Sequence, residues 1–265
     1  MTFQQRIDEQ LHVYYSTGNE ARRLSKSLGG RLEFVRTLEL VQGAVPAGAR
    51  ITDIGGANGV YAAPLAEAGY AVVLVDPVAY QVEEARRHGT FDALVGDARQ
   101  LPFSDGEFDA ALLLGPLYHL QSRADRVGAL REASRVVKPG GLVIAAVISR
   151  MSAFTDSYFE RAEQGLEPWF DEGAQILADG WHDAPEIPFP FGHFHTGPEL
   201  HSEAEEAGLT VEAIHGVEGP LALAAEYLPA DHPSFESQLQ IAREYSLHPG
   251  LREAGPHMLL IGRAG

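Results

Sequence analysis

Short apolar runs alternate with amphipathic stretches through the middle of this 265-residue chain. Apolar, β-branched runs predict five strands, one ending at residue 54 and the others over residues 71–76, 93–95, 109–114 and 142–147. Helical spacing predicts the segments between them, near residues 61–67, 80–88 and 124–137. Strands and helices that alternate in this way predict an α/β fold, in which helices cover both faces of a parallel sheet.

The two flanks of this central block follow other patterns. Before it, Leu32, Val35, Leu38 and Val41 recur at steps of three, which predicts a helix with a narrow apolar stripe. Beyond it, aromatic side chains replace the alternation. The remaining patterns predict a helix over residues 198–207, a strand over 210–215, further helices over 221–252 and a last strand over 258–262.

A chain of this length can bury one sizeable core, so we expect a single domain. Its four parts along the chain are an N-terminal helical segment over residues 1–48, the alternating core over 49–147, an inserted cap over 148–194 and completion of the sheet over 195–265.

The first strand of the block ends in a glycine cluster that reads Asp-Ile-Gly-Gly-Ala-Asn-Gly from Asp53 to Gly59. Gly55, Gly56 and Gly59 lack Cβ atoms, so the backbone can take positive φ values and a ligand can lie against it. The free N–H groups at the start of the following helix would face that ligand. This stretch is typical of a cofactor-binding turn.

The second strand, Val-Val-Leu-Val before Asp76 and Pro77, is an unbroken apolar run, as in strands buried on both faces. It ends in a carboxylate. An acidic residue at the tip of the second strand is placed to accept both hydroxyls of a ribose. The glycine turn and Asp76 together predict a site for an adenosyl nucleotide.

The spacing D-x-G-x-x-x-G from Asp53 to Gly59 resembles motif I of the class I S-adenosylmethionine (SAM) dependent methyltransferases. Blocks over residues 96–103, 108–114 and 131–141 are similar to the family in order and spacing. The resemblance implies a Rossmann-like, seven-stranded, mostly parallel sheet with an antiparallel last strand, SAM as cofactor and methyl transfer as the activity. A nucleotide-binding oxidoreductase is the alternative enzyme class, but its site would require G-x-G-x-x-G.

The resemblance also implies roles for residues at the strand ends. Asp53 would orient the glycine turn by accepting backbone N–H bonds, and Asp76 would accept the ribose hydroxyls. Pro77 and Leu114 would also contact the cofactor. Asp97 would accept from the adenine amino group, and Ala98 would leave room for the ring. The alternative for Asp97 is a turn residue without ligand contact.

In many relatives the N-terminal helices fold over the cofactor as a lid. By this resemblance Tyr15, with Tyr14, would close the site, and Arg36 would hold the methionyl carboxylate bidentately. The alternative is that the tyrosines pack sideways and Arg36 is solvated.

The segment that leaves the fourth strand at Leu114 carries the candidate chemistry, Tyr118 and His119. Methyl transfer is an in-line displacement, so the protein must align the acceptor, exclude water and, for a hydroxyl or ammonium acceptor, remove a proton. His119 is the candidate base because its pKa suits that step, and Tyr118 is the candidate hydrogen-bond partner of the acceptor. The alternative is that His119 only caps a helix or packs, since some methyltransferases need no base.

The aromatic stretch over residues 148–194, which includes Trp169, is typical of an acceptor pocket for an apolar or aromatic small molecule. The alternative is a small satellite core under a long loop. We also expect acceptor contacts from His193, His195 and Glu218. Two nearby histidines invite a metal, but a catalytic zinc takes three protein ligands and no third is evident nearby, so we expect none.

Composition narrows the partners. Lys and Arg number 20 against 37 Asp and Glu, which gives a formal net charge of −17. Such a surface repels phosphate backbones and anionic lipid, so we expect a small-molecule substrate, not nucleic acid or a membrane. Oxygen or nitrogen is a more plausible acceptor atom than carbon. A protein or RNA acceptor and a non-catalytic SAM-binding protein of the same fold stay open as alternatives.

Two further features concern the compartment. The chain has no cysteine, which leaves no disulfide framework, thiolate metal site or cysteine nucleophile. Its first residues lack the apolar core of a signal peptide. We therefore expect a cytoplasmic protein.

Overall fold

The fold is that of a computed structural model, which describes residues 12, 15, 23–163, 165, 170–183 and 191–265. Seven strands form one sheet in the order β3-β2-β1-β4-β5-β9-β8. These strands are β1 (Arg50–Ile54), β2 (Ala71–Asp76), β3 (Asp92–Val95), β4 (Phe108–Leu113), β5 (Val137–Ile148), β8 (Leu209–Gly216) and β9 (His257–Ala264).

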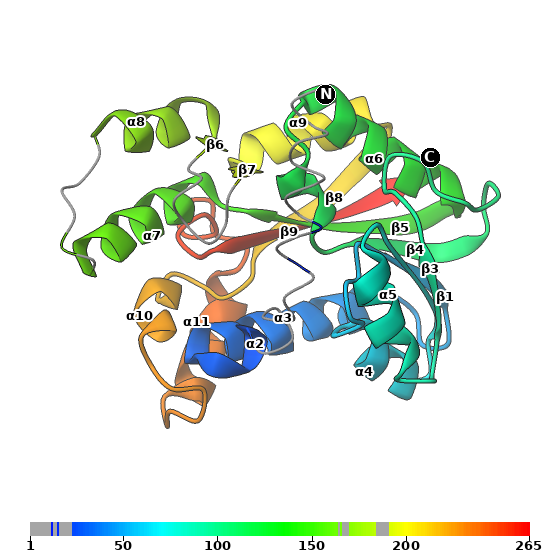
Figure 1. Cartoon of the computed structure of the whole chain (residues 1–265), viewed down its shortest axis with the longest axis horizontal. Coiled ribbons are helices and arrows are strands. Elements are labelled where there is room, and N and C mark those ends of the chain that lie inside the picture. Colours follow the sequence, from blue (N-terminus) through cyan, green and yellow to red (C-terminus); the bar gives the residue numbers. More distant parts are fainter. Residues whose placement is uncertain (1–11, 13–14, 16–22, 164, 166–169, 184–190) are drawn as a thin grey trace.

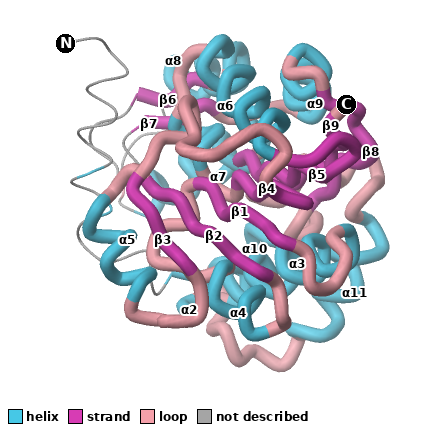
Figure 2. Tube along the Cα trace, turned by 90° about the vertical axis from the view of Figure 1, so that its right-hand side faces the viewer, coloured by secondary structure: helices cyan, strands magenta, loops and turns pink. Residues whose placement is uncertain are grey.

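The sheet is parallel over its first five strands and antiparallel around the last one. β1 pairs in parallel with β2 and β4, and β4 pairs in parallel with β5. β9 is antiparallel to both of its neighbours, β5 and β8. Figure 2 shows the parallel strands β3, β2, β1 and β4 side by side. The mostly parallel sheet with an antiparallel last strand that the resemblance implied is confirmed.

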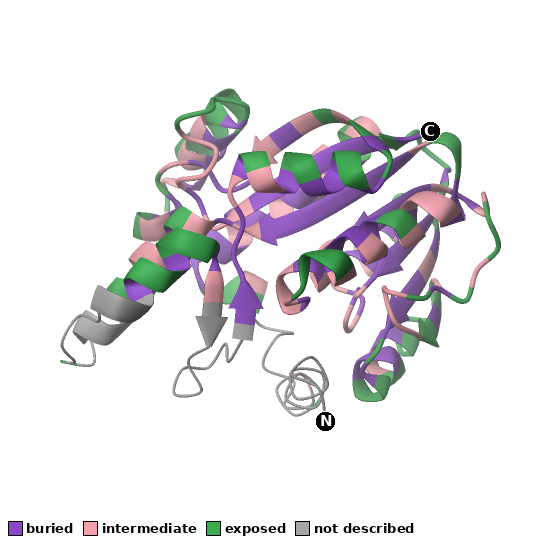
Figure 3. Cartoon of the chain, turned by 90° about the horizontal axis from the view of Figure 1, so that it is seen from above, coloured by how far each residue is buried: buried purple, intermediate pink, exposed green. Residues whose placement is uncertain are grey.

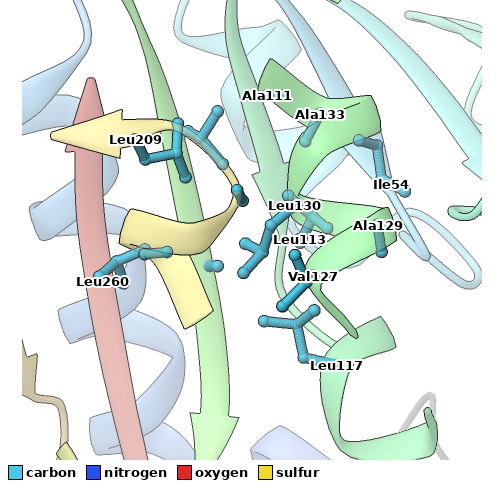
Figure 4. Close-up of a cluster of buried hydrophobic side chains, with 14 of the residues drawn as sticks. Ile54, Ala111, Leu113, Leu117, Val127, Ala129, Leu130, Ala133, Leu209 and Leu260 are labelled. Atoms are coloured by element: carbon cyan, nitrogen blue, oxygen red, sulfur yellow. The ribbon is translucent and has the colours of Figure 1, made fainter. Parts of the chain in front are cut away.

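Helices cover both faces of this sheet (Figure 1). One face carries α3 (Leu28–Ala44), α4 (Ala62–Glu67) and α5 (Ala79–Arg86), and the other carries α6 (Arg123–Val136) and α9 (Gly197–Glu206). In β4, Ala111 and Leu113 pack toward α6, while Ala110 and Leu112 pack toward the opposite layer. Figure 4 shows Leu113 against Leu130 of α6. Burial on both faces explains why the strands read as unbroken apolar runs.

The predicted apolar stripe lies on α3, which docks at two places. Val41 is fully buried in the layer against the sheet. Leu28 and Leu32, nearer the start of the helix, pack instead with α10 (Ala222–Glu226) and α11 (Phe235–Tyr245). Before α3 lies the short helix α2 (Arg23–Lys26). Residues 1–11, 13–14 and 16–22 of the predicted lid lie outside the described residues.

Between β5 and α9 the chain makes an excursion away from the sheet, at the left of Figure 1. It contains α7 (Arg150–Glu163), α8 (Phe170–Asp179), β6 (Trp181–Asp183) and β7 (Phe191–His193), and β6 and β7 pair antiparallel. Phe154, Ile176 and Phe194 form a small core of their own, as in the second interpretation of this stretch. Tyr158 and Phe159 of α7 are exposed.

Figure 3 shows the sheet buried between helices whose outer sides are exposed. Among the described residues, no helix combines the length and the apolar character that crossing a membrane requires.

Candidate functional site

Two glycines let the end of β1 approach its neighbours closely. Gly55 has a φ of 72°, and its N–H donates to the Val75 carbonyl at 2.7 Å. A Cβ atom on Gly55 would lie 2.6 Å from Cγ of Pro116, and one on Gly56 would lie 2.6 Å from Oδ2 of Asp53. Any side chain at either position would therefore clash with the wall of the site.

Ala57 is the described non-glycine residue with a positive φ, 47°. Its N–H donates to Oδ2 of Asp76 at 2.9 Å, and the N–H of Val78 donates to Oδ1 at 2.8 Å. The turn after β1 and the start of α5 thus hold the Asp76 carboxylate from two sides. Backbone strain of this kind is concentrated at ligand sites. Nothing in the sequence marks Ala57 for this conformation, and the sequence analysis missed it.

A cavity opens where these strand ends meet the 3₁₀ helix η2 (Pro116–His119). Most of the predicted site residues line it. They are Tyr15, Asp53, Gly55, Gly56, Asp76, Pro77, Asp97, Ala98, Leu114, Tyr118 and His119. Residues from strands far apart in the sequence therefore share one cavity, as the convergence of the parallel strand ends predicted.

The Asp53 carboxylate is buried, and neither of its oxygens has a hydrogen-bond partner among the described residues. The expectation that it accepts backbone N–H bonds from the glycine turn is therefore wrong. Burial, and then the charge of Asp76, raises the pKa of Asp53 to about 7. An unsatisfied carboxylate facing a cavity fits a ligand that brings its own donors, such as an ammonium group.

Asp76 is buried too, but its pKa is raised less than that of Asp53. Burial raises its pKa to about 6, although the two backbone N–H bonds oppose the shift. Each of its oxygens uses one lone pair on the backbone and keeps capacity for another donor. This arrangement suits the two adjacent hydroxyls of a ribose.

Asp97 lines the cavity and also shapes a turn, so both interpretations of this residue describe part of its position. Its Oδ1 accepts from the Arg99 N–H at 2.8 Å and from Nε of Arg99 at 2.9 Å. Burial raises the pKa of the Asp97 carboxyl, but the bonds from Arg99 outweigh it and hold that pKa below its usual value.

His119 and Tyr118 form the opposite wall. The hydroxyl of Tyr15 lies 2.8 Å from Nε2 of His119, and Nε2 of Gln81 donates to the Tyr15 carbonyl at 2.5 Å. The hydroxyl of Tyr118 lies 3.2 Å from where a Cβ of Gly115 would stand. Burial lowers the pKa of His119 to about 3, so its imidazole is neutral at physiological pH.

Arg36 does not line the cavity, contrary to its predicted contact with the cofactor. It is buried on α3, where Nη1 donates to Oε2 of Glu39 at 2.6 Å. Arg23 lines the cavity instead, and Glu33 accepts from its Nη1 and Nη2 at 2.5 and 2.7 Å. The sequence did not indicate that Arg23 would line the cavity, because the neighbouring Arg22 has the same side chain.

Glu218 lies outside the cavity lining too. It is 2% exposed and bonds to Nδ1 of His257, in a buried cluster that includes Glu33. Burial alone would lower the pKa of His257, but the Glu33 and Glu218 carboxylates raise it to about 9. Glu218 therefore pairs with a protein cation, and the structure does not bring it to the place predicted for an acceptor.

His193 and His195 are buried beside the cavity but do not line it. Nε2 of His193 lies 2.9 Å from Oε1 of Glu199, and Nε2 of His195 lies 3.2 Å from Oε2 of Glu203. Glu203 is the third potential metal ligand beside the two histidines, which the sequence did not reveal. Its Oε1 accepts a hydrogen bond from Nη2 of Arg126 at 2.7 Å. These histidines belong to an ion-pair network, not to the cavity wall.

Two predicted site residues remain, Gly59 and Trp169. Gly59 faces away from the cavity, because a Cβ there would lie 2.5 Å from Cζ of Phe91. Its φ of 84° supports the turn itself. Trp169, the predicted aromatic contact of the acceptor, lies outside the described residues.

Residues 52–145 match the family model described as a methyltransferase domain. The chain is 32% identical over 185 residues to the demethylmenaquinone methyltransferase of Renibacterium salmoninarum. The matched region covers 59% of this chain and 76% of that protein. It is 38% identical over 108 residues to the ubiquinone biosynthesis O-methyltransferase of Methylocella silvestris, covering 39% of this chain and 41% of the relative.

Among solved structures, the fold resembles a SAM-dependent methyltransferase of Thermotoga maritima described as a possible histamine N-methyltransferase. The TM-score is 0.62 at 21% identity, and the match covers 96% of this chain and 99% of the other. At that identity the likeness concerns the fold alone.

Proposed function

We propose that this chain, which belongs to the class I SAM-dependent methyltransferases, transfers a methyl group to an oxygen or nitrogen atom of a small molecule. One observation carries the proposal. A single cavity brings the carboxylates Asp53 and Asp76 together with Tyr118 and His119. The first pair suits a nucleotide with a charged amino-acid tail, and the second pair offers an acceptor both a hydrogen-bond partner and a proton acceptor.

Different residues of the cavity suit different parts of the cofactor. Asp76 would accept the ribose hydroxyls and Asp97 the adenine amino group, as the family resemblance implies. The unpartnered Asp53 carboxylate fits the ammonium of the methionyl tail, and Arg23 fits its carboxylate. Bound there, SAM supplies a methyl group activated by a sulfonium.

His119 is suited to receive the acceptor's proton. With its pKa lowered to about 3, the imidazole stays unprotonated at neutral pH and therefore remains able to accept. A general base is most effective when its pKa lies near the operating pH, so this imidazole is a weak base and alignment of the acceptor must carry much of the rate. Tyr15, hydrogen-bonded to Nε2, orients the ring, and Tyr118 offers a hydroxyl to align the acceptor.

An aromatic ring that bears a hydroxyl is the acceptor we favour. The cavity wall combines apolar groups, Leu24, Val60 and Leu120, with the polar pair of η2. Two relatives carry names from quinone biosynthesis, and one of those is named an O-methyltransferase. A protein or RNA acceptor is the second candidate, and the net charge of −17 disfavours it for RNA.

The test is transfer of labelled methyl groups from SAM into an extract of the source cells, with small molecules separated from macromolecules before counting. We expect label in the small-molecule fraction, where the mass of the product identifies the acceptor. Label in protein or RNA alone would overturn the substrate class.

Two variants then test the base on the identified acceptor. We expect His119→Ala to lower kcat about 100-fold, the lower end of the usual contribution of a general base. Tyr15→Phe, which keeps the ring and removes only the hydroxyl, should have a smaller effect. Near wild-type turnover in His119→Ala would show that the transfer needs no base at this position.

A further inference from the structure

We propose that a buried network of Arg126, Glu203 and His195 positions the segment over residues 116–121, which carries Tyr118 and His119 at the cavity. None of the three network residues lines that cavity. The inference rests on the proposed function, because it assigns a role to the placement of Tyr118 and His119. Arg126 is the central positioning residue.

Arg126 holds the end of η2 through its backbone. It lies on α6 and is only 3% exposed. Its Nη1 donates to the Leu120 carbonyl at 3.1 Å and to the Gln121 carbonyl at 2.6 Å, directly after His119. Both carbonyls belong to the two residues that follow η2, so a side chain that binds them fixes the path of the chain as it leaves this helix.

The other edge of the same guanidinium is fixed by Glu203 of α9, which is fully buried. Nε of Arg126 donates to Oε1 and Oε2 at 3.0 and 3.1 Å, and Nη2 donates to Oε1 at 2.7 Å. Rotation of Arg126 away from η2 would break its three bonds to this buried carboxylate and leave Glu203 with His195 at 3.2 Å and Arg123 at 3.5 Å, which is unfavourable. The planar fork therefore has one arrangement that satisfies both Glu203 and the two carbonyls.

His195 ties this pair to the sheet. Its Nε2 lies 3.2 Å from Oε2 of Glu203, and its backbone N–H donates to the carbonyl of Ile148, the last residue of β5, at 2.9 Å. The network thus relates the end of η2 to the end of a central strand. Leu117 of η2 packs in the same core as Val127 of α6, next to Arg126 (Figure 4). Apolar and ionic contacts hold one segment in one place.

The test replaces Arg126 by lysine, which keeps the charge but has no fork to span Glu203 and two carbonyls. The matched control is Arg131→Lys on the same helix. Arg131 is exposed and donates to the Glu206 carbonyl of α9 at 3.3 Å. Each protein is measured with S-adenosylhomocysteine as the probe, by amide hydrogen exchange over residues 117–121 and by calorimetric binding.

We expect exchange over residues 117–121 to accelerate at least tenfold in Arg126→Lys and to stay at the wild-type rate in Arg131→Lys. Exchange in β1 and β2 should stay unchanged, and the affinity for the probe should change less than threefold, because Arg126 does not line the cavity and bonds of their own hold Gly55 and Asp76 in place. Unchanged exchange over residues 117–121, or acceleration spread evenly over the sheet, would overturn the positioning role.

If Arg126→Lys does not fold, Glu203→Gln takes its place. It keeps the side-chain volume and one acceptor, and we expect a smaller acceleration in the same five residues. Wild-type exchange in a folded Glu203→Gln protein would likewise contradict the proposal.

The positioning role and the proposed function fail in different ways. With the acceptor identified from the extract, Arg126→Lys should lower kcat while KM for SAM stays within threefold. If exchange accelerates but His119→Ala keeps full turnover, the network positions the segment and the base role of His119 is wrong. If exchange is unchanged while His119→Ala is inactive, the base role stands and the network is only structural.

Discussion

Two groups of buried charges lie at the η2 segment and differ in how completely they are paired. In the cavity, the Asp53 carboxylate has no hydrogen-bond partner among the described residues, and burial raises its pKa to about 7. In the network, burial would also raise the pKa of Glu203, but His195 and Arg126 lower it to about 2. The same kind of group is thus costly in one place and stabilising in the other.

The difference indicates what each group is for. A buried charge that the protein satisfies itself gives shape, since moving any member leaves another unpaired. A buried charge left unsatisfied lowers the stability of the free protein and gains from a ligand with the missing donors. On our proposal, the ammonium of the cofactor supplies the missing donors, and binding recovers the free energy that Asp53 costs in the free protein. Four predictions test this contrast.

The largest effect is expected from the network. Glu203→Ala removes the carboxylate that accepts three bonds from the buried Arg126 guanidinium, and Glu199 remains 3.9 Å away. We expect the free energy of unfolding at pH 7 to fall by about 3–5 kcal/mol. Urea unfolding followed by circular dichroism measures it. Glu206→Ala, whose side chain is 53% exposed and pairs with Arg123, is the control and should cost less than about 1 kcal/mol. A loss no larger in Glu203→Ala than in Glu206→Ala would remove the contrast.

Asp53→Asn should act in the opposite direction. Since the folded-state pKa of Asp53 lies above its unfolded value, its ionisation costs stability that increases as pH rises from about 4 to about 7. We expect the ligand-free variant to gain about 2 kcal/mol at pH 7.5, because each unit of pKa shift is worth about 1.4 kcal/mol and the amide is still desolvated.

The gain should disappear below about pH 4, where Asp53 is protonated in both states. The same variant should bind S-adenosylhomocysteine more weakly than the wild type. A variant that is less stable than the wild type at pH 7.5, by urea unfolding, would show that Asp53 has a partner within the protein.

The affinity for the cofactor should depend on pH through both cavity carboxylates, because Asp53, with a pKa of about 7, and Asp76 both titrate between pH 5 and pH 7. The Asp76 pKa of about 6 means that this carboxylate takes up a proton below that pH and loses an acceptor for the ribose. We expect calorimetry to show affinity for S-adenosylhomocysteine about tenfold weaker at pH 5 than at pH 7. Asp76→Asn should bind more weakly than the wild type at pH 7 and keep the smaller pH dependence that Asp53 provides. A wild-type affinity that is equal at pH 5 and pH 7 would contradict the assignment.

The smallest effect separates two arginines. Arg23 lines the cavity and Arg36 does not. We expect Arg23→Gln to weaken S-adenosylhomocysteine binding about fivefold, which is about 1 kcal/mol. Arg36→Gln should change the affinity less than twofold, whatever it does to stability. Equal losses in both variants would mean that the arginines act through the position of α3, not through a contact.

The parts of this molecule that the sequence predicted well are those where local pattern and spacing decide the outcome. The second strand was expected over residues 71–76, the bounds of β2, because a strand buried on both faces is an unbroken apolar run. Asp53 and Asp76 were found because a glycine turn and a strand end stand at fixed positions relative to the nucleotide. Both line the cavity.

The misplaced residues depend on how distant elements dock. Arg36 lies on a helix with apolar residues on more than one side, and the packing of that helix against the sheet, α10 and α11 leaves Arg36 outside the cavity lining. Arg126 and Glu203 are 77 residues apart, and no local pattern links them. The aromatic stretch after β5 carried a composition signal, but composition does not distinguish a pocket wall from the small core that Phe154 joins.

The way the chain leaves and rejoins the sheet has a consequence for how this protein can change. Arg150 N–H donates to the His195 carbonyl at 2.9 Å, and His195 N–H donates to the Ile148 carbonyl at 2.9 Å. These two bonds close the base of the excursion, so its ends stay together whatever lies between them. Insertions are best tolerated where the flanking backbone is fixed in this way. We therefore expect insertions in the outer part of this segment to keep the register of β5 and β9, while β7 at its end stays in contact with η2.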